Sequence, residues 1–221
     1  MANGAGRQVI VYVEGKSDQQ ALRTLLAPLI ERCAVSGTGF DFIPLEGKRR
    51  VMGAAPERAV NVLRNNPNAF VVALPDLYPP DEGGPHHTAA ELRSLLTRNF
   101  RSTLRTKVGD DERLAARFQV HCFKHDLEAL ILAAPAALAA RLGVAAVPIT
   151  WTVPVEDHDH GDPPKRVVER IFAQHHQKYV AAVDAPLILA KADFMEIAKA
   201  CPQCFKPLIE FFEALCNRGL E

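Results

Sequence analysis

The chain has 221 residues, 48% of them hydrophobic, which is enough for one large α/β domain or two small ones. Its 26 basic and 26 acidic side chains give a formal net charge of zero, which excludes a general electrostatic attraction to nucleic acid or membranes. The five cysteines are scattered, and no segment has the composition of a signal peptide or a membrane helix. These features predict a cytoplasmic protein without a disulfide scaffold or a membrane partner.

The first two-thirds of the chain alternate between apolar segments typical of strands and amphipathic segments typical of helices. Strands are predicted at residues 8–13, 40–45, 69–74 and 117–123, and helices at 17–33, 56–64, 88–104 and 126–143. Pro28 is expected to bend or shorten the first helix, and Ser17 with Gln20 resembles a capping box. A second proline, Pro135, is expected to break the helix that starts at Asp126.

The last third is predicted to be mainly helical. Residues 144–162 form an irregular segment with a short strand at 149–153, and helices follow at 163–179, 186–201 and 202–216. The order of elements predicts an α/β fold with a mainly parallel central sheet flanked by helices. We expect a core over residues 1–143, with residues 144–221 packed on it as one unit.

Acidic residues follow two of the predicted strands. Glu14 ends the first strand, and Asp76 follows the apolar run 70–74. Because ligands bind at the carboxyl ends of parallel strands, these two carboxylates can converge on one hard cation such as Mg²⁺. Asp18, Asp81 and Glu82 are further candidate ligands. The alternative is that these acids are ordinary solvated loop residues.

A third acidic segment, His125-Asp126-Leu127-Glu128, directly follows the fourth predicted strand. His125 and Glu128 are three residues apart and therefore share one face of a helix. Two interpretations are open. Either these residues cap the helix, or they form a third acidic corner of the site, with His125 orienting a carboxylate.

Basic residues that could hold phosphates occur at three places. Lys16 follows Glu14, and Lys165 and Arg166 lie in the first turn of a predicted helix, where the helix dipole disfavours cations. An anionic partner would explain that placement. The run 48–50 is interpreted as a solvated basic face.

Two further segments resemble metal sites only superficially. The acidic and histidine-rich run 156–160 and the pair His86-His87 lack the ligand spacing of a structural zinc site. Cys201 and Cys204 form a single Cys-x-x-Cys, which we interpret as a turn between two helices with partly buried thiols.

Taken together, three segments resemble the Toprim (topoisomerase–primase) fold. They are the strand ending in Glu14-Gly15 with Asp18 after it, the strand ending at Asp76, and the run His125-x-x-Glu128-Ala129-Leu130. More narrowly, the chain resembles an uncharacterised bacterial Toprim-like family of unknown function. That resemblance adds three later segments, namely Pro163-Pro164-Lys165-Arg166, Lys178-Tyr179 and Ala200-Cys201-Pro202.

The resemblance implies a single Toprim-like domain with a metal-dependent acidic centre and a nuclease-like activity. In Toprim enzymes the strand-one glutamate is a general acid or base, and an Asp-x-Asp pair binds magnesium. This chain has Tyr78 where the second aspartate would be. Asp81, Glu82 or Glu128 could take the place of this second aspartate. A site with one metal ion and a degenerate site without activity are both possible alternatives. The resemblance also implies a partner ATPase in bacterial defence.

The resulting hypothesis is a Mg²⁺- or Mn²⁺-dependent phosphodiester hydrolase acting on DNA or RNA, in phage defence or DNA repair. Glu14, Asp76 and Lys165 would be catalytic. Metal ligands would come from Glu14, Asp18, Asp76, Asp81 and Glu128, phosphate contacts from Lys16, Lys165 and Arg166, and support from Gly15 and His125. The alternatives are a non-catalytic protein-interaction module and a small-molecule phosphohydrolase.

Overall fold

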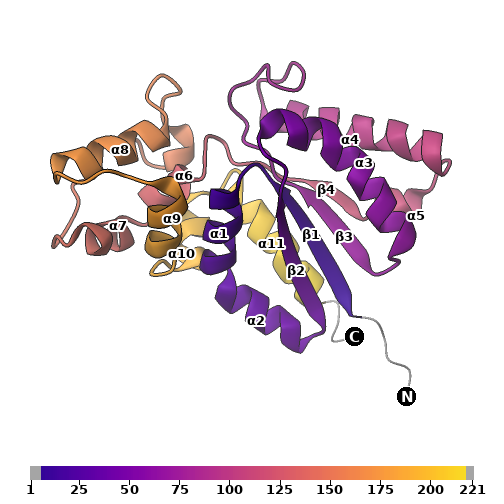
Figure 1. Cartoon of the computed structure of the whole chain (residues 1–221), viewed down its shortest axis with the longest axis horizontal. Helices are drawn as coiled ribbons and strands as arrows, with labels where there is room; N and C mark the ends of the chain where they lie inside the picture. Colours follow the sequence, from indigo (N-terminus) through magenta and orange to yellow (C-terminus); the bar gives the residue numbers. More distant parts are fainter. Residues whose placement is uncertain (1–5, 218–221) are drawn as a thin grey trace.

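The protein is built around a four-stranded, all-parallel sheet (Figure 1). The structure, a computed structural model, describes residues 6–217. The strands are β1 (Arg7–Val13), β2 (Thr38–Pro44), β3 (Ala69–Ala73) and β4 (Phe118–Val120), in the spatial order β2-β1-β3-β4. The α/β class and the parallel sheet predicted from the sequence are confirmed.

Helices connect the strands and cover both faces of the sheet. Those before β4 are α1 (Lys16–Leu25), α2 (Ala27–Val35), α3 (Lys48–Asn65), α4 (Ala89–Lys107) and α5 (Glu112–Ala115). Those after β4 are α6 (Glu128–Leu132), α7 (Pro135–Leu142), α8 (Pro164–Gln174), α9 (Ala181–Leu189), α10 (Phe194–Ala200) and α11 (Phe205–Asn217), with a 3₁₀ turn at Val155–Asp157. Among residues 6–217, none of the helices has the length and apolar character needed to cross a membrane.

The alternation of side chains along β1 divides the apolar interior into two cores. Val9, Val11 and Val13 face one core, whereas Ile10 and Tyr12 face the other. The first core is shared with α1, α2 and α6–α11, and the second with α3 and α4, on opposite sides of the sheet (Figure 1). Because both faces are covered, the central strands β1 and β3 are buried along most of their length, whereas the edge strand β2 alternates between buried and exposed residues.

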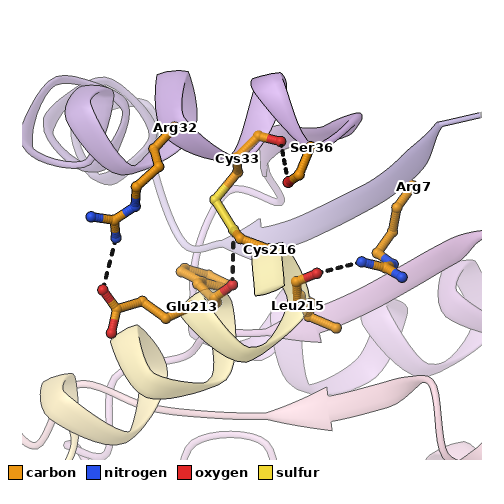
Figure 2. The surroundings of a disulfide bond; sticks show 8 residues. Arg7, Arg32, Cys33, Ser36, Glu213, Leu215 and Cys216 are labelled. Carbon is orange, nitrogen blue, oxygen red and sulfur yellow. Dashed lines mark hydrogen bonds and ion pairs between the residues drawn. A yellow bond between two sulfur atoms is a disulfide. The ribbon is translucent and has the colours of Figure 1, made fainter. Parts of the chain in front are cut away.

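The carboxyl-terminal helix α11 joins the first core beneath the sheet. The Phe212 ring meets the Phe40 ring of β2 edge-on, with a centroid distance of 5.0 Å. A disulfide links Cys33 of α2 to Cys216 of α11 (Figure 2). The Arg32–Glu213 ion pair, at 2.7 Å, joins the same two helices. The scattered cysteines of the sequence do not predict this pairing, because 183 residues separate the two cysteines and only the tertiary fold brings them together.

The other three cysteines are free and buried. Cys201 and Cys204 lie between α10 and α11, which confirms the predicted interhelical turn. Glu156 caps the start of α11, because its carboxylate accepts hydrogen bonds from the backbone N–H groups of Gln203 (2.6 Å) and Cys204 (2.8 Å). Glu156 therefore has a structural role in the run 156–160.

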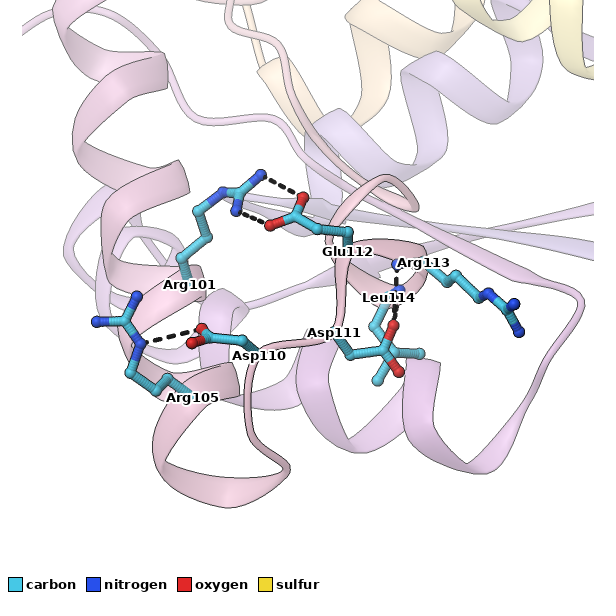
Figure 3. A network of polar contacts seen from close by, with 7 residues as sticks. All are labelled: Arg101, Arg105, Asp110, Asp111, Glu112, Arg113 and Leu114. Carbon is cyan, nitrogen blue, oxygen red and sulfur yellow. Dashed lines mark hydrogen bonds and ion pairs between the residues drawn. The ribbon is translucent and has the colours of Figure 1, made fainter.

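An exposed ion-pair network fixes the turn between α4 and β4 (Figure 3). Arg101 makes a bidentate pair with Glu112, at 2.6 and 3.0 Å, and Arg105 donates to Asp110 at 3.0 Å. Asp111 caps α5 through the backbone N–H groups of Arg113 and Leu114. Exposed pairs of this kind each contribute little to stability, so their role is mainly to fix the geometry of the turn.

Several predicted elements differ from the observed ones. Pro28 separates α1 from α2, as expected, but α3 begins at Lys48 rather than near Pro56. The predicted strand at 149–153 does not form, and the predicted helix 186–201 is two helices, α9 and α10. The Ser17–Gln20 capping box is also wrong, because Asp18 Oδ2 accepts from the Gly15 N–H at 2.7 Å instead.

Candidate functional site

Two carboxylates far apart in the sequence meet at the carboxyl edge of the sheet. Glu14 directly follows β1, and Asp76 follows the neighbouring strand β3. The backbone N–H of Asp76 donates to Glu14 Oε1 at 2.8 Å. The central position of β1 and β3 in the sheet therefore brings the loops that carry these two residues into direct contact.

Glu14 and Asp76 belong to a hollow of about 330 Å³. Six carboxylate residues and one lysine contribute to its lining: Glu14, Asp18, Glu46, Asp76, Asp126, Glu128 and Lys165. These residues come from the ends of β1, β2 and β3 and from the segments that start α6 and α8. The hollow thus collects acidic groups from four of these parts of the fold and a lysine from the fifth.

Burial and mutual repulsion make the carboxylates in this hollow weaker acids. Burial raises the pKa of Glu14 to about 7, with the hydrogen bond from the Asp76 N–H acting in the opposite direction. Burial also raises the pKa of Asp76 well above its usual range, and the charges of Glu14 and Asp18 add to that shift. The cluster therefore binds protons, or another cation, more readily than separate surface acids.

The segment before α6 supplies two more of these acids. Burial raises the pKa of Asp126 to about 7, and Glu128 adds to that shift. Glu128 is buried and accepts a hydrogen bond from the Tyr179 hydroxyl at 3.0 Å. Asp126 and Glu128 both line the hollow, so the structure brings this segment to the other acids. Asp126 was not among the residues singled out from the sequence, although it lies inside the singled-out segment.

Lys165 is the one basic residue among the described residues that line this hollow. Its side chain is exposed at the start of α8, and its backbone N–H donates to Asp126 Oδ2 at 3.2 Å. The Lys165 charge acts on Asp18, Asp126 and Glu128, lowering the pKa of each. This acidic surrounding accounts for a cation in the first turn of a helix.

The remaining predicted residues lie outside the lining of the hollow or have local roles. Lys16, Asp81 and Arg166 are exposed and do not contribute to the lining. Gly15 does line it, but with an extended backbone (φ −134°), so the turn into α1 does not itself require glycine. The turn after β2 does favour glycine, because Gly47 has φ +107° and donates its N–H to the Glu14 carbonyl at 2.8 Å.

Lys48 was interpreted as part of a solvated basic face, and this interpretation is wrong. Its side chain is 2% exposed, and its Nζ donates to the carbonyls of Leu77 (2.7 Å) and Pro79. Lys48 therefore ties α3 to the loop that follows Asp76. The sequence signal that could have identified it is its position directly after Gly47, at the carboxyl edge of the sheet.

His125 does not orient a carboxylate. Its ring lies beside those of Tyr78 and His160, and it is hydrogen-bonded to the backbone of Glu156. Its Nε2 has no hydrogen-bond partner among residues 6–217. His125 thus belongs to an aromatic cluster beside the carboxylates.

The donor set of the hollow matches hard divalent cations. In the part of the chain that the structure describes, no three histidine, cysteine or acidic side chains are already grouped around a common metal position. Magnesium is commonly held through one or two carboxylates, with water and substrate phosphate oxygens completing its coordination. The crowded carboxylates around Asp76 fit that mode, because a cation would offset the burial and the repulsion that together raise the pKa of Asp76.

Comparisons with known proteins place the chain in a family and identify similar structures. A family model described as "Domain of unknown function (DUF4276)" matches residues 13–213. No curated protein matches the chain. The C-terminal region of the Burkholderia pseudomallei OLD protein is similar, with a TM-score of 0.49 and 16% identity over 94% of this chain and 98% of that chain. The C-terminal region of the Xanthomonas campestris pv. campestris OLD protein has a TM-score of 0.47 and 15% identity over 98% of both chains.

Proposed function

The chain belongs to the DUF4276 family, whose function is not known. We propose that it is a divalent-cation-dependent phosphodiester hydrolase acting on nucleic acid. The observation that carries this proposal is the hollow at the carboxyl edge of the sheet, where Glu14 and Asp76 meet beside Lys165. In parallel α/β sheets this edge is where ligands bind. The Toprim relationship suggested by the sequence belongs to the same proposal.

Glu14 would transfer the proton in this reaction. A pKa of about 7 means that both its acid and its base form are populated near neutral pH, which suits a general acid or base. Its Oε1 is held by the Asp76 N–H, so the carboxylate has a fixed position at the edge of the hollow.

Asp76 would hold Mg²⁺ or Mn²⁺ together with Asp18, Asp126 or Glu128. When bound, such an ion neutralises charge on phosphoryl oxygens and orients the substrate for in-line displacement. Lys165 would contact a flanking phosphate without reading the base sequence. Tyr78 occupies the place of the second aspartate of the Toprim pattern, so we propose an arrangement with one metal ion. An ATPase partner would supply the additional contacts to the phosphate backbone that a chain with a net charge of zero does not provide by itself.

The experiment pairs metal binding with cleavage. Calorimetric titration with Mn²⁺ and nicking of supercoiled plasmid are measured for the wild type, Glu14→Gln and Asp76→Asn. We expect Asp76→Asn to lose at least about tenfold in Mn²⁺ affinity, because it removes a charged ligand. We expect Glu14→Gln to lose about 10²-fold or more in cleavage.

The matched control is Glu169→Gln, which makes the same chemical change on the exposed surface of α8. It is expected to behave as the wild type in both assays. Equal cleavage by all the variants, or no Mn²⁺ uptake by the wild type, would overturn the proposal.

A second candidate function, a non-catalytic protein-interaction module, is favoured by one observation. Within residues 6–217, the acids of the hollow are not already grouped in threes around a metal position. The Mn²⁺ titration distinguishes the two candidate functions. A hydrolase should bind Mn²⁺ and lose affinity in Asp76→Asn, whereas a non-catalytic module should show no Mn²⁺ binding that depends on Asp76.

A further inference from the structure

A second hollow, of about 340 Å³, lies next to the carboxylate hollow. Asp76 and Asp126 line both of them. The rest of its wall is made of rings, from Tyr78, Pro79, Pro80, His125, His160 and Pro163. A ligand that reaches from one hollow to the other would thus pass from a set of acids to a set of flat apolar surfaces.

The three aromatic rings come from separate segments and pack against one another, with Tyr78 and His125 stacked and His160 tilted against both. The Tyr78 ring centroid lies 3.6 Å from that of His160 and 5.7 Å from that of His125, and the two histidine centroids are 4.9 Å apart. His125 is buried, Tyr78 is half-buried and His160 is exposed. The cluster is therefore anchored on the inside and open on the outside, unlike aromatic residues that only fill a core.

The polar groups of this aromatic hollow indicate a ligand that is planar but not purely apolar. Among residues 6–217, His125 Nε2 and Asp126 Oδ1 are buried without a hydrogen-bond partner. Buried polar atoms are nearly always paired, so these two are available to a ligand that brings its own donors.

We infer that this aromatic hollow is a stacking subsite for a nucleobase. The inference deepens the proposed function and rests on it, because the base would belong to the strand whose phosphate lies at the neighbouring carboxylates. Every base has a π-face that stacks on aromatic side chains, so such a site tolerates different sequences. A stacked base must leave its duplex neighbours, and the expected substrate is therefore single-stranded or frayed at this nucleotide.

The test separates bases from phosphates. Fluorescence anisotropy in Ca²⁺, which takes the same oxygen ligands as Mg²⁺, compares a labelled single-stranded oligothymidylate with an abasic oligonucleotide of equal length. We expect the wild type to bind the base-containing strand at least about fivefold more tightly, the lower end of base–aromatic stacking. Tyr78→Ala and His160→Ala should abolish this preference and leave the affinity for the abasic strand unchanged.

Two control variants keep the test specific. Tyr78→Phe retains the ring and should keep the preference, and His87→Ala removes an exposed histidine of the same loop that does not line the aromatic hollow. Because His160 is exposed, its replacement leaves the buried core intact. Thermal unfolding of each variant checks that the fold is retained.

The outcomes distinguish this inference from the proposed function. Plasmid nicking together with equal binding of the two strands would overturn the stacking subsite and leave the hydrolase standing. A base preference that survives Tyr78→Ala and His160→Ala combined would also overturn it. A preference lost in those variants, in a protein that does not cleave, would support the subsite and contradict the hydrolase.

Discussion

Glu14 occupies a position in which its negative charge is disfavoured. It is half-buried, close to Asp18 and Glu82, and only partly compensated by the Asp76 N–H and the Lys48 ammonium. Such a carboxyl group prefers to be protonated, or to lie beside a cation supplied from outside. The same environment that suits Glu14 for proton transfer therefore costs the fold stability when no cation is bound.

This cost predicts a specific dependence of stability on pH. The pKa of Glu14 rises from 4.5 to about 7 on folding, so the folded state binds more protons than the unfolded state between these values. The free energy of unfolding therefore falls as pH rises through that window, and the loss is complete above about pH 7. Asp126 shifts in the same direction and adds to the effect.

Urea unfolding in EDTA at about pH 5 and about pH 8 measures this loss for the wild type and Glu14→Gln. The glutamine side chain does not ionise, so the variant should lose about 1–2 kcal/mol less than the wild type over the interval. Glu169→Gln should follow the wild type. Identical losses for the wild type and Glu14→Gln would show that Glu14 does not titrate in this window.

The sequence allowed Glu14, Asp76 and Glu128 to be singled out because each follows a recognisable apolar run. Asp126 and Glu46 were missed as site residues, since their contribution depends on how the loops after β4 and β2 turn toward the hollow. Lys48 was misread because its burial is decided by the loop of residues 77–79, far away in the sequence. A local pattern identifies strand ends, whereas loop contacts are set by the tertiary structure.

Helix α3 is tied to the loop after β3 through one buried ammonium group. Lys48 donates to Leu77 and Pro79, and the His86 ring lies between the carbonyls of Gly84 (2.7 Å) and Leu77 (3.1 Å). These contacts hold the segment that carries Asp76 at one end and Tyr78 within it. The positions of both hollows therefore depend on α3.

Lys48→Met tests this connection, because methionine keeps most of the side-chain volume but donates no hydrogen bond. We expect a loss of about 1–3 kcal/mol in stability and faster amide hydrogen exchange over residues 77–87. Arg49→Met, an exposed neighbour on the same helix, should change neither quantity. Unchanged exchange in Lys48→Met would mean that the loop is held by other contacts.

Elements were predictable from the sequence where they carry a strong apolar period, as in β1, α4 and α11. The residues at 149–153 have a composition typical of a strand, but no neighbouring strand pairs with them in the described sheet. Pro186 was taken as a helix start, yet it lies inside α9, and residues 190–193 separate α9 from α10. A short segment becomes a strand only where a neighbouring strand can hydrogen-bond to it. Tertiary packing can also keep a helix intact at a proline that would otherwise end it.

Contacts between segments near opposite ends of the chain hold the whole molecule together. The disulfide between Cys33 and Cys216 joins α2 to α11 across 183 residues, and cross-links over long loops restrict the unfolded chain most. Reduction should therefore lower stability by about 2–5 kcal/mol. Urea unfolding with and without dithiothreitol measures this, and the double variant Cys33→Ala/Cys216→Ala should not respond to the reductant. An equal response of the wild type and the double variant would assign the effect to the other thiols.

The arrangement of the two cores also affects how the protein is made. The second core draws almost all of its residues from the segment between β1 and Cys122, whereas the first needs Phe205, Leu208 and Phe212 of α11. On the ribosome, one face of the sheet can be covered while synthesis is under way, but the other stays incomplete until the last helix emerges from the exit tunnel. The apolar surface that α11 covers in the folded protein therefore stays exposed on the nascent chain until synthesis is nearly finished.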